Sequence, residues 1–229
     1  MVKPIRFSRA AEDNGNSPPQ ASPRRYRVEL ITAESEASRF VRHRRLIRFP
    51  QLTMPLLAAY TPGHWEVSHT DEIVQRVDFD KRLDVVGITA NTPAAPHAYA
   101  LSREFHRRGV AVVIGGPHAT LLPEEVAKHA DAVVVGEGEL IWPQLLADFE
   151  KGELKRIYRA CALPDLERMP APRWDLIQGR VYGKGVTIAT RGCPFACEYS
   201  PSRKCIGGAC ATARSVKSWM KSGTCPDAP

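Results

Sequence analysis

Short apolar runs alternate with helical segments from residue 27 to residue 150, and this alternation constrains the fold more than any other feature. The expected strands are 28–31, 66–70, 84–89, 111–114 and 131–135, and the expected helices are 55–60, 96–108, 123–129 and 140–150. The run 84–89 is apolar at nearly every position, as in a parallel strand buried on both faces. The pattern predicts an α/β fold, a flavodoxin-like (Rossmann-like) five-stranded parallel sheet of order 2-1-3-4-5 with helices on both faces.

The carboxyl ends of the expected strands are the places where such a sheet binds ligands. Three of these ends carry glycines, hydroxyls, amides or carboxylates, and glycine lets a large ligand approach the backbone closely. Tight strand-to-helix turns would also use glycine, but three such loops on one rim favour a ligand site. The predicted cofactor-binding residues are Thr89, Asn91, Thr92, Gly115, Gly116, His118, Gly136, Glu137 and Gly138.

The six cysteines crowd into the last third of the chain, which is not typical of a disulfide framework. Cys193 and Cys197 are the predicted metal ligands, because soft thiolates at close spacing suit iron–sulfur clusters. Ser200 follows three positions after Cys197, and a serine hydroxyl is a poor iron ligand at neutral pH. A zinc site remains open as an alternative, built from Cys193, Cys197, Cys205 and Cys210.

The chain carries a net charge of +7, and many of its arginines lie before residue 50. A basic segment suits nucleic-acid contact or a solvated surface. The segment 39–48 contains one aromatic residue, Phe40, with Phe49 beside it, so bases have no stacking platform. We therefore expect small-molecule partners, namely a cofactor and an unknown substrate, and no nucleic acid.

No apolar run reaches the ~20 residues that span a bilayer. The N-terminal segment is charged and lacks the apolar core of a secretory signal. We expect a cytoplasmic protein without a membrane span.

Several motifs together resemble a known enzyme family. They are Asp84-Val85-Val86-Gly87-Ile88, Gly115-Gly116-Pro117-His118-Ala119-Thr120, Gly136-Glu137-Gly138-Glu139, Trp174-Asp175-Leu176 and Thr190-Arg191-Gly192-Cys193-Pro194-Phe195. Residues 27–150 resemble the cobalamin-binding domain of radical S-adenosylmethionine enzymes, and 163–199 resemble the linker and first barrel strand of that family. The resemblance implies cobalamin, a [4Fe–4S] cluster and S-adenosylmethionine as cofactors, with a methyltransferase or cyclase reaction.

The same resemblance implies that cobalamin binds without a protein histidine on cobalt. The Asp-x-His-x-x-Gly motif that supplies this ligand in methyltransferases is absent, and Thr32-Ala33-Glu34-Ser35 stands in its place.

The family pattern holds to Tyr199 and fails from Ser200 onward. Our hypothesis is a frameshift or truncation, since a substitution alone would leave the downstream periodicity intact. Translation of the other two reading frames beyond codon 199 tests it.

The expected organisation follows from these patterns. It comprises a disordered extension (1–26), a cobalamin-binding domain (27–152), a linker (153–184), the first strand and cluster loop of an incomplete radical-enzyme barrel (185–200) and an irregular tail (201–229). We expect a cobalamin-binding domain of an enzyme that is catalytically impaired as written. The alternative is a non-catalytic module that binds cobalamin or a nucleotide.

Overall fold

The computed structural model describes residues 25–35, 50–160, 162–177, 186, 188–193, 195, 197–198 and 210–212. The arginine-rich segment 39–48, Ser200 and most of the expected tail lie outside the described residues.

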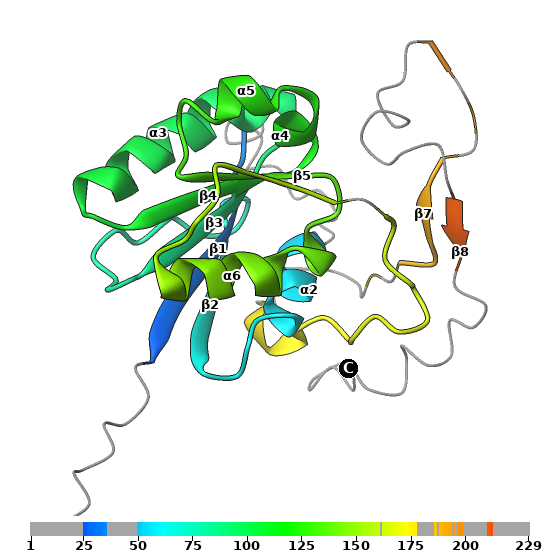
Figure 1. Ribbon diagram of the computed structural model, residues 1–229, viewed down its shortest axis with the longest axis horizontal. Helices are drawn as coiled ribbons and strands as arrows, with labels where there is room; N and C mark the ends of the chain where they lie inside the picture. The colour runs from blue at the N-terminus through cyan, green and yellow to red at the C-terminus, as the bar shows by residue number, and fades with distance from the viewer. Residues whose placement is uncertain are drawn as a thin grey trace, which may run out of the picture.

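A parallel sheet of six strands forms the centre of the protein (Figure 1). Its order is β2-β1-β3-β4-β5-β6, and every neighbouring pair is parallel. The strands are β1 (Tyr26–Thr32), β2 (Trp65–Asp71), β3 (Val85–Thr89), β4 (Ala111–Gly115), β5 (Ala132–Val135) and β6 (Ile157–Arg159). The predicted order 2-1-3-4-5 is confirmed, but the predicted number of five strands is wrong.

The sixth strand, β6, has three residues and no continuous apolar run, so its sequence gives no strand signal. Two contacts hold it at the edge of the sheet. Its backbone pairs with β5, and the Tyr158 hydroxyl donates a hydrogen bond to Asp148 Oδ2 at 2.9 Å. Burial, together with the Asp148 carboxylate, raises the pKa of Tyr158 to about 12, so the hydroxyl keeps its proton.

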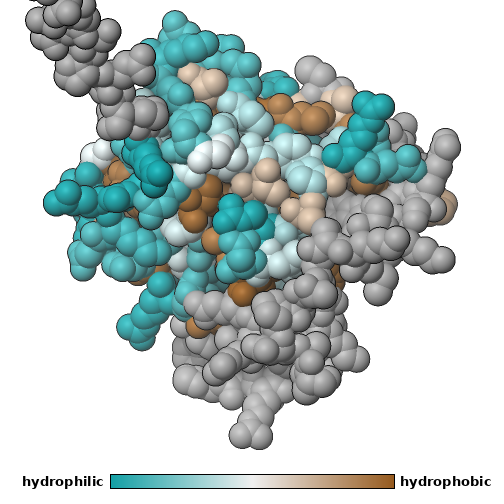
Figure 2. Space-filling view, turned by 90° about the horizontal axis from the view of Figure 1, so that it is seen from below, coloured by the Kyte–Doolittle hydropathy of each residue, from teal (hydrophilic) through white to brown (hydrophobic). Residues whose placement is uncertain are grey.

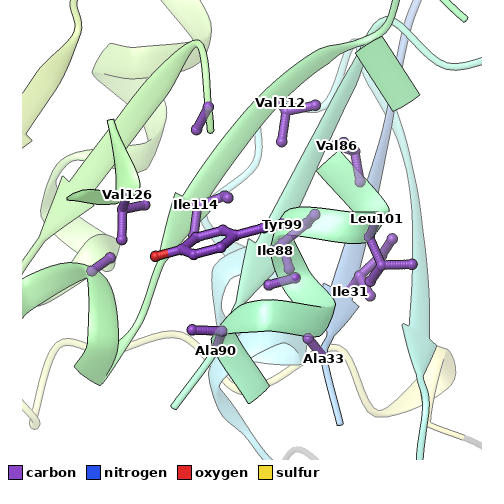
Figure 3. Packing of buried hydrophobic residues seen from close by; sticks show 14 of the residues in the cluster. Ile31, Ala33, Val86, Ile88, Ala90, Tyr99, Leu101, Val112, Ile114 and Val126 are labelled. Atoms are coloured by element: carbon purple, nitrogen blue, oxygen red, sulfur yellow. The ribbon is translucent and has the colours of Figure 1, made fainter. Parts of the chain in front are cut away.

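Helices cover both faces of the sheet (Figure 1). The residues that pack on one face come from α3 (Ala95–Arg107), α4 (Pro117–Leu121) and α5 (Pro123–Val126), and the other face is covered by α2 (Thr53–Ala59) and α6 (Trp142–Lys151). Successive strand residues alternate between these faces. Val112 and Ile114 therefore pack in the cluster shown in Figure 3, whereas Val113 packs in the opposite cluster.

The carboxyl ends of the central strands are level with one another. Thr32 of β1 pairs with Thr89 of β3, and Thr89 pairs with Gly115 of β4. Chain segments that leave these strands therefore start at the same edge of the sheet.

The segment after β6 packs against α2. Leu166 and Met169 are buried with Leu56, and the Arg173 amide donates a hydrogen bond to the Pro55 carbonyl at 2.9 Å. The segment includes a 3-10 turn, η3 (Trp174–Leu176). It thus forms part of the core rather than a loose connection.

Two short antiparallel strands follow, β7 (Thr190–Gly192) and β8 (Cys210–Thr212). The first strand expected within 185–200 is β7, which begins at Thr190, where backbone pairing opposite Thr212 begins. A strand within the tail was not expected from the sequence.

The surface of the described residues is mixed in character. On the face seen in Figure 2, hydrophilic residues surround small separate apolar patches. Among the described residues, no helix has the length and hydropathy needed to cross a membrane.

Candidate functional site

A cavity of about 550 Å³ opens at the carboxyl ends of β3, β4 and β5. It lies between the sheet and α2, and residues 188–192 contribute to its wall. The lining residues are Thr53, Met54, Leu57, Gly87, Ile88, Thr89, Val113, Gly115, Gly116, Pro117, Val134, Gly136, Glu137, Gly138, Glu139, Trp142, Ile188, Thr190, Arg191 and Gly192.

Six of the nine predicted cofactor-binding residues line this cavity. They are Thr89, Gly115, Gly116, Gly136, Glu137 and Gly138. Three different strand ends supply them, and the level edge of the sheet brings them together.

The other three predicted residues support loops beside the cavity. Asn91 Oδ1 accepts a hydrogen bond from the Ala94 amide at 3.1 Å and so caps the turn η1 (Thr92–Ala94). His118 is 4% exposed, and its Nε2 lies 2.9 Å from the Tyr99 hydroxyl. Its Nδ1 lies 3.3 Å from Thr92 Oγ1. His118 and Thr92 therefore join α3 and α4 to the loop after β3.

Gly116 makes the sharp turn after β4. Its φ of 95° is an angle that residues with a side chain rarely adopt. A Cβ atom here would lie 2.5 Å from Thr89 Oγ1 and 2.9 Å from the Ala90 carbonyl oxygen. The glycine is therefore required by the fold, whatever binds in the cavity.

A single hydroxyl joins the two glycine turns. Thr120 Oγ1 donates to the Gly116 carbonyl at 3.0 Å and accepts from the Gly136 amide at 3.0 Å. Because both turns line the cavity, Thr120 fixes the distance between its two rims.

The inner walls of the cavity are apolar, and the sequence analysis did not identify them as site residues. Gly87 leaves room for the Trp142 ring, since a Cβ atom at Gly87 would lie 3.2 Å from Trp142 Cη2. The Trp142 indole N–H donates to Thr61 Oγ1 at 2.9 Å. The apolar side chains of these walls are Met54, Leu57, Val113, Val134 and Trp142. A glycine in the middle of an apolar strand was the available signal.

Arg191 was also missed, and it carries the main electrostatic contact of the site. Its guanidinium donates a hydrogen bond to Glu137 Oε2, and its Nη2 lies 2.6 Å from Glu139 Oε1. The second contact is an ion pair outside hydrogen-bond geometry, so this buried oxygen has no hydrogen bond among the described residues.

Burial raises the pKa of Glu137, and Arg191 opposes this shift while Glu139 adds to it. Burial and the Glu139 charge likewise raise the pKa of Tyr60 nearby. Two carboxylates and one guanidinium therefore share one side of the cavity.

The predicted metal ligands lie just beyond Arg191. Cys193 is half-buried, Cys197 is exposed, and both are free thiols. Among the described residues, no group of three histidine, cysteine, aspartate or glutamate side chains is arranged to hold a metal ion. Ser200 and Cys205 lie outside the described residues, so the cluster ligands stay a prediction.

A family model described as the B12 binding domain matches residues 50–146. The chain is 35% identical over 156 residues to the bacteriochlorophyllide d C-8(2)-methyltransferase of Chlorobaculum tepidum, covering 65% of this chain and 35% of that protein. It is 30% identical over 156 residues to the C-12(1)-methyltransferase of the same organism, covering 65% of this chain and 34% of that protein. The chain spans about a third of the length of these curated relatives.

The fold is similar to a solved structure of TsrM, a radical S-adenosylmethionine methyltransferase from Kitasatospora setae with cobalamin and a [4Fe-4S] cluster bound. The TM-score is 0.59 and the sequence identity 17%, over 85% of this chain and 45% of that chain. At this identity the likeness concerns the fold alone.

Proposed function

Because the chain carries a B12-binding domain related to those of cobalamin-dependent radical S-adenosylmethionine methyltransferases, we propose that its cavity holds the nucleotide tail of cobalamin. The observation that carries this proposal is the cavity itself, since it lies at the carboxyl edge of the sheet and has glycines in its lining. The resemblance inferred from the sequence motifs is confirmed by these comparisons.

The glycines suit a bulky ligand because the absence of a side chain leaves space in the cavity. A Cβ atom at Gly138 would be in ordinary contact with Leu57 and Val134, at 3.5 and 3.6 Å, and one at Gly115 would lie 3.5 Å from Val134. A side chain at either position would therefore take up space in the cavity, and its Cβ atom would not clash with the fold. Bound cobalamin would supply a carrier for a methyl group, and the glycine turns would hold it against the rim.

A desalting experiment with hydroxocobalamin tests the proposal. The purified protein is mixed with hydroxocobalamin, passed through the column, and examined for corrinoid absorption. We expect co-elution with the wild type and loss of most corrinoid from Gly115→Val and Gly138→Val. Gly63→Val is the matched control, because no atom lies within 4 Å of a Cβ there and the residue does not line the cavity. Absence of corrinoid from the wild type contradicts the proposal, as does full retention by both cavity variants.

We propose further that the chain as written does not cleave S-adenosylmethionine. Cys193 and Cys197 supply two thiolates, whereas the cluster of the family needs three, and Ser200 occupies the third position. The protein then acts as a cobalamin-binding module. If it is instead a nucleotide-binding module, the desalted protein should retain a nucleotide in place of the corrinoid. Anaerobic iron reconstitution also distinguishes the metals, because an iron–sulfur cluster is brown and a zinc site is colourless.

A further inference from the structure

The depth of the cavity differs in chemistry from its mouth. Gly87 and Val113 are paired in the sheet and each lies two residues before the end of its strand, about 7 Å inside the edge. Val134 of β5 faces the same side and belongs to the same cluster as Val113. The backbone groups of these strands are used by the sheet ladder, so they offer no free donors or acceptors.

The helices complete this apolar environment. Met54 and Leu57 of α2 and Trp142 of α6 face the strands across the cavity. The single polar group among these side chains is the Trp142 indole N–H, and Thr61 already accepts its hydrogen bond. Among the described lining residues, the deep walls therefore provide no side chain free to pair with a polar ligand atom.

The polar lining residues belong to the mouth of the cavity, to the start of α2 or to β7. Thr89 ends β3, Glu137 and Glu139 follow β5, Thr53 begins α2, and Thr190 begins β7. Arg191 is engaged with the two glutamates. Polar parts of a ligand are thus accommodated at the edge of the sheet, and its apolar end in the depth.

We propose that this cavity selects its corrinoid by the base of the nucleotide tail, and that it favours dimethylbenzimidazole over a purine such as adenine. The inference rests on the proposed function. Adenine carries an exocyclic amine and additional ring nitrogens that lose their hydrogen bonds to water on burial. The apolar walls offer no donor or acceptor that would replace these bonds. The methyl groups of dimethylbenzimidazole, in contrast, gain contacts with Leu57, Val113 and Val134.

The test compares three corrinoids on the full chain: cobalamin, the adenine-bearing cobamide, and cobinamide, which has no nucleotide tail. Equilibrium binding is measured by absorption titration. We expect cobalamin to bind at least about tenfold more tightly than the adenine-bearing cobamide, since a cavity of this kind leaves polar ligand groups unpaired. Cobinamide should bind more weakly than cobalamin as well.

A pair of neighbouring valines provides matched variants. Val113→Thr places a hydroxyl on the cavity side of β4, whereas Val112→Thr places it on the opposite face, within the cluster of Figure 3. The preference for cobalamin should fall severalfold in Val113→Thr and stay unchanged in Val112→Thr. Val134→Thr and Val133→Thr repeat the comparison on β5 if either β4 variant fails to fold.

The outcomes separate the two proposals. Equal affinities for cobalamin and the adenine-bearing cobamide overturn the selectivity while leaving corrinoid binding intact. Equal binding of cobinamide also overturns it, because the tail would then lie outside the cavity. If none of the three corrinoids binds, the proposed function itself is wrong, and the selectivity falls with it.

Discussion

Arg191 donates a hydrogen bond to Glu137, a residue 54 positions earlier in the chain. The arginine stands two residues before Cys193, and the glutamate lies in the glycine loop after β5. The exposed fraction of the side chain is 13% for Arg191 and 18% for Glu137, so water screens this ion pair less than one on the surface. It fixes the segment that enters the cysteine loop to the rim of the cavity.

Removal of this contact should expose Cys193. In Arg191→Ala the segment before the cysteine loses both carboxylate contacts, and we expect alkylation of Cys193 by iodoacetamide to become severalfold faster. Cys197 is already exposed, so its rate should change little. Peptide mass spectrometry gives both rates from one sample.

Arg173→Ala is the control for a general effect of losing an arginine, because Arg173 pairs with Asp175 on the surface. Glu137→Gln combined with Glu139→Gln should reproduce the effect of Arg191→Ala. An unchanged Cys193 rate in Arg191→Ala would show that the ion pair does not hold the segment.

Replacement of the Thr120 hydroxyl should loosen the two glycine turns. Thr120→Val leaves the Gly136 amide without its acceptor, and we expect the free energy of unfolding to fall by about 1–2 kcal/mol. Corrinoid retention should fall too, because the rims are no longer joined. Urea denaturation and the desalting experiment measure these effects, and Thr120→Ser, which keeps the hydroxyl, should behave like the wild type in both.

His69 should make stability depend on pH in the weakly acidic range. Burial lowers its pKa below the usual 6.5, although the Leu176 carbonyl near Nδ1 opposes the shift. The unfolded chain then takes up the proton more readily than the folded one. The contribution of the neutral ring is therefore fully present above pH 6.5 and is lost as the pH falls through the folded-state value.

Melting temperatures of the wild type and His69→Gln between pH 7.5 and pH 5 test this dependence. We expect the wild type to lose more stability than the variant over this interval. Parallel curves for the two proteins would rule out a titration of His69 linked to folding.

A third thiolate should improve iron binding. We expect the reconstituted wild type to hold fewer than four irons per chain and Ser200→Cys to retain more, since thiolate is the ligand that iron–sulfur clusters select. Iron counting and a 5′-deoxyadenosine assay provide the measurements. Four irons with measurable cleavage in the wild type would contradict our view of the chain as written.

Much of the fold follows from residues whose local pattern agrees with their burial. The run Val85–Thr89 is buried throughout and forms β3 as its composition predicts. Ile157–Arg159 gives no such signal, because β6 depends on Tyr158 reaching Asp148 and on the open edge of β5. Tertiary contacts of this kind cannot be inferred from a three-residue pattern.

The site divides in a similar way. The glycines at strand ends could be placed at the rim from topology, since parallel strands end at one edge. The residues of the apolar walls could not be predicted, because the sequence around Val113 and Val134 does not distinguish them from other core residues. Arg191 was hidden for another reason: its partners lie more than 50 positions away, and spacing along the chain carries no information about such a pair.

Gly87 and Trp142 also have a consequence for the history of this protein. A Cβ atom on Gly87 would lie 3.0 Å from Leu30 Cδ2 and 3.2 Å from Trp142 Cη2, so both neighbouring side chains would have to shift by a few tenths of an ångström to admit it. Across homologues we expect a residue other than glycine at 87 to occur together with smaller side chains at positions 30 and 142. A change at one of these positions alone would leave a tight contact or a void, so packing couples the evolution of all three positions.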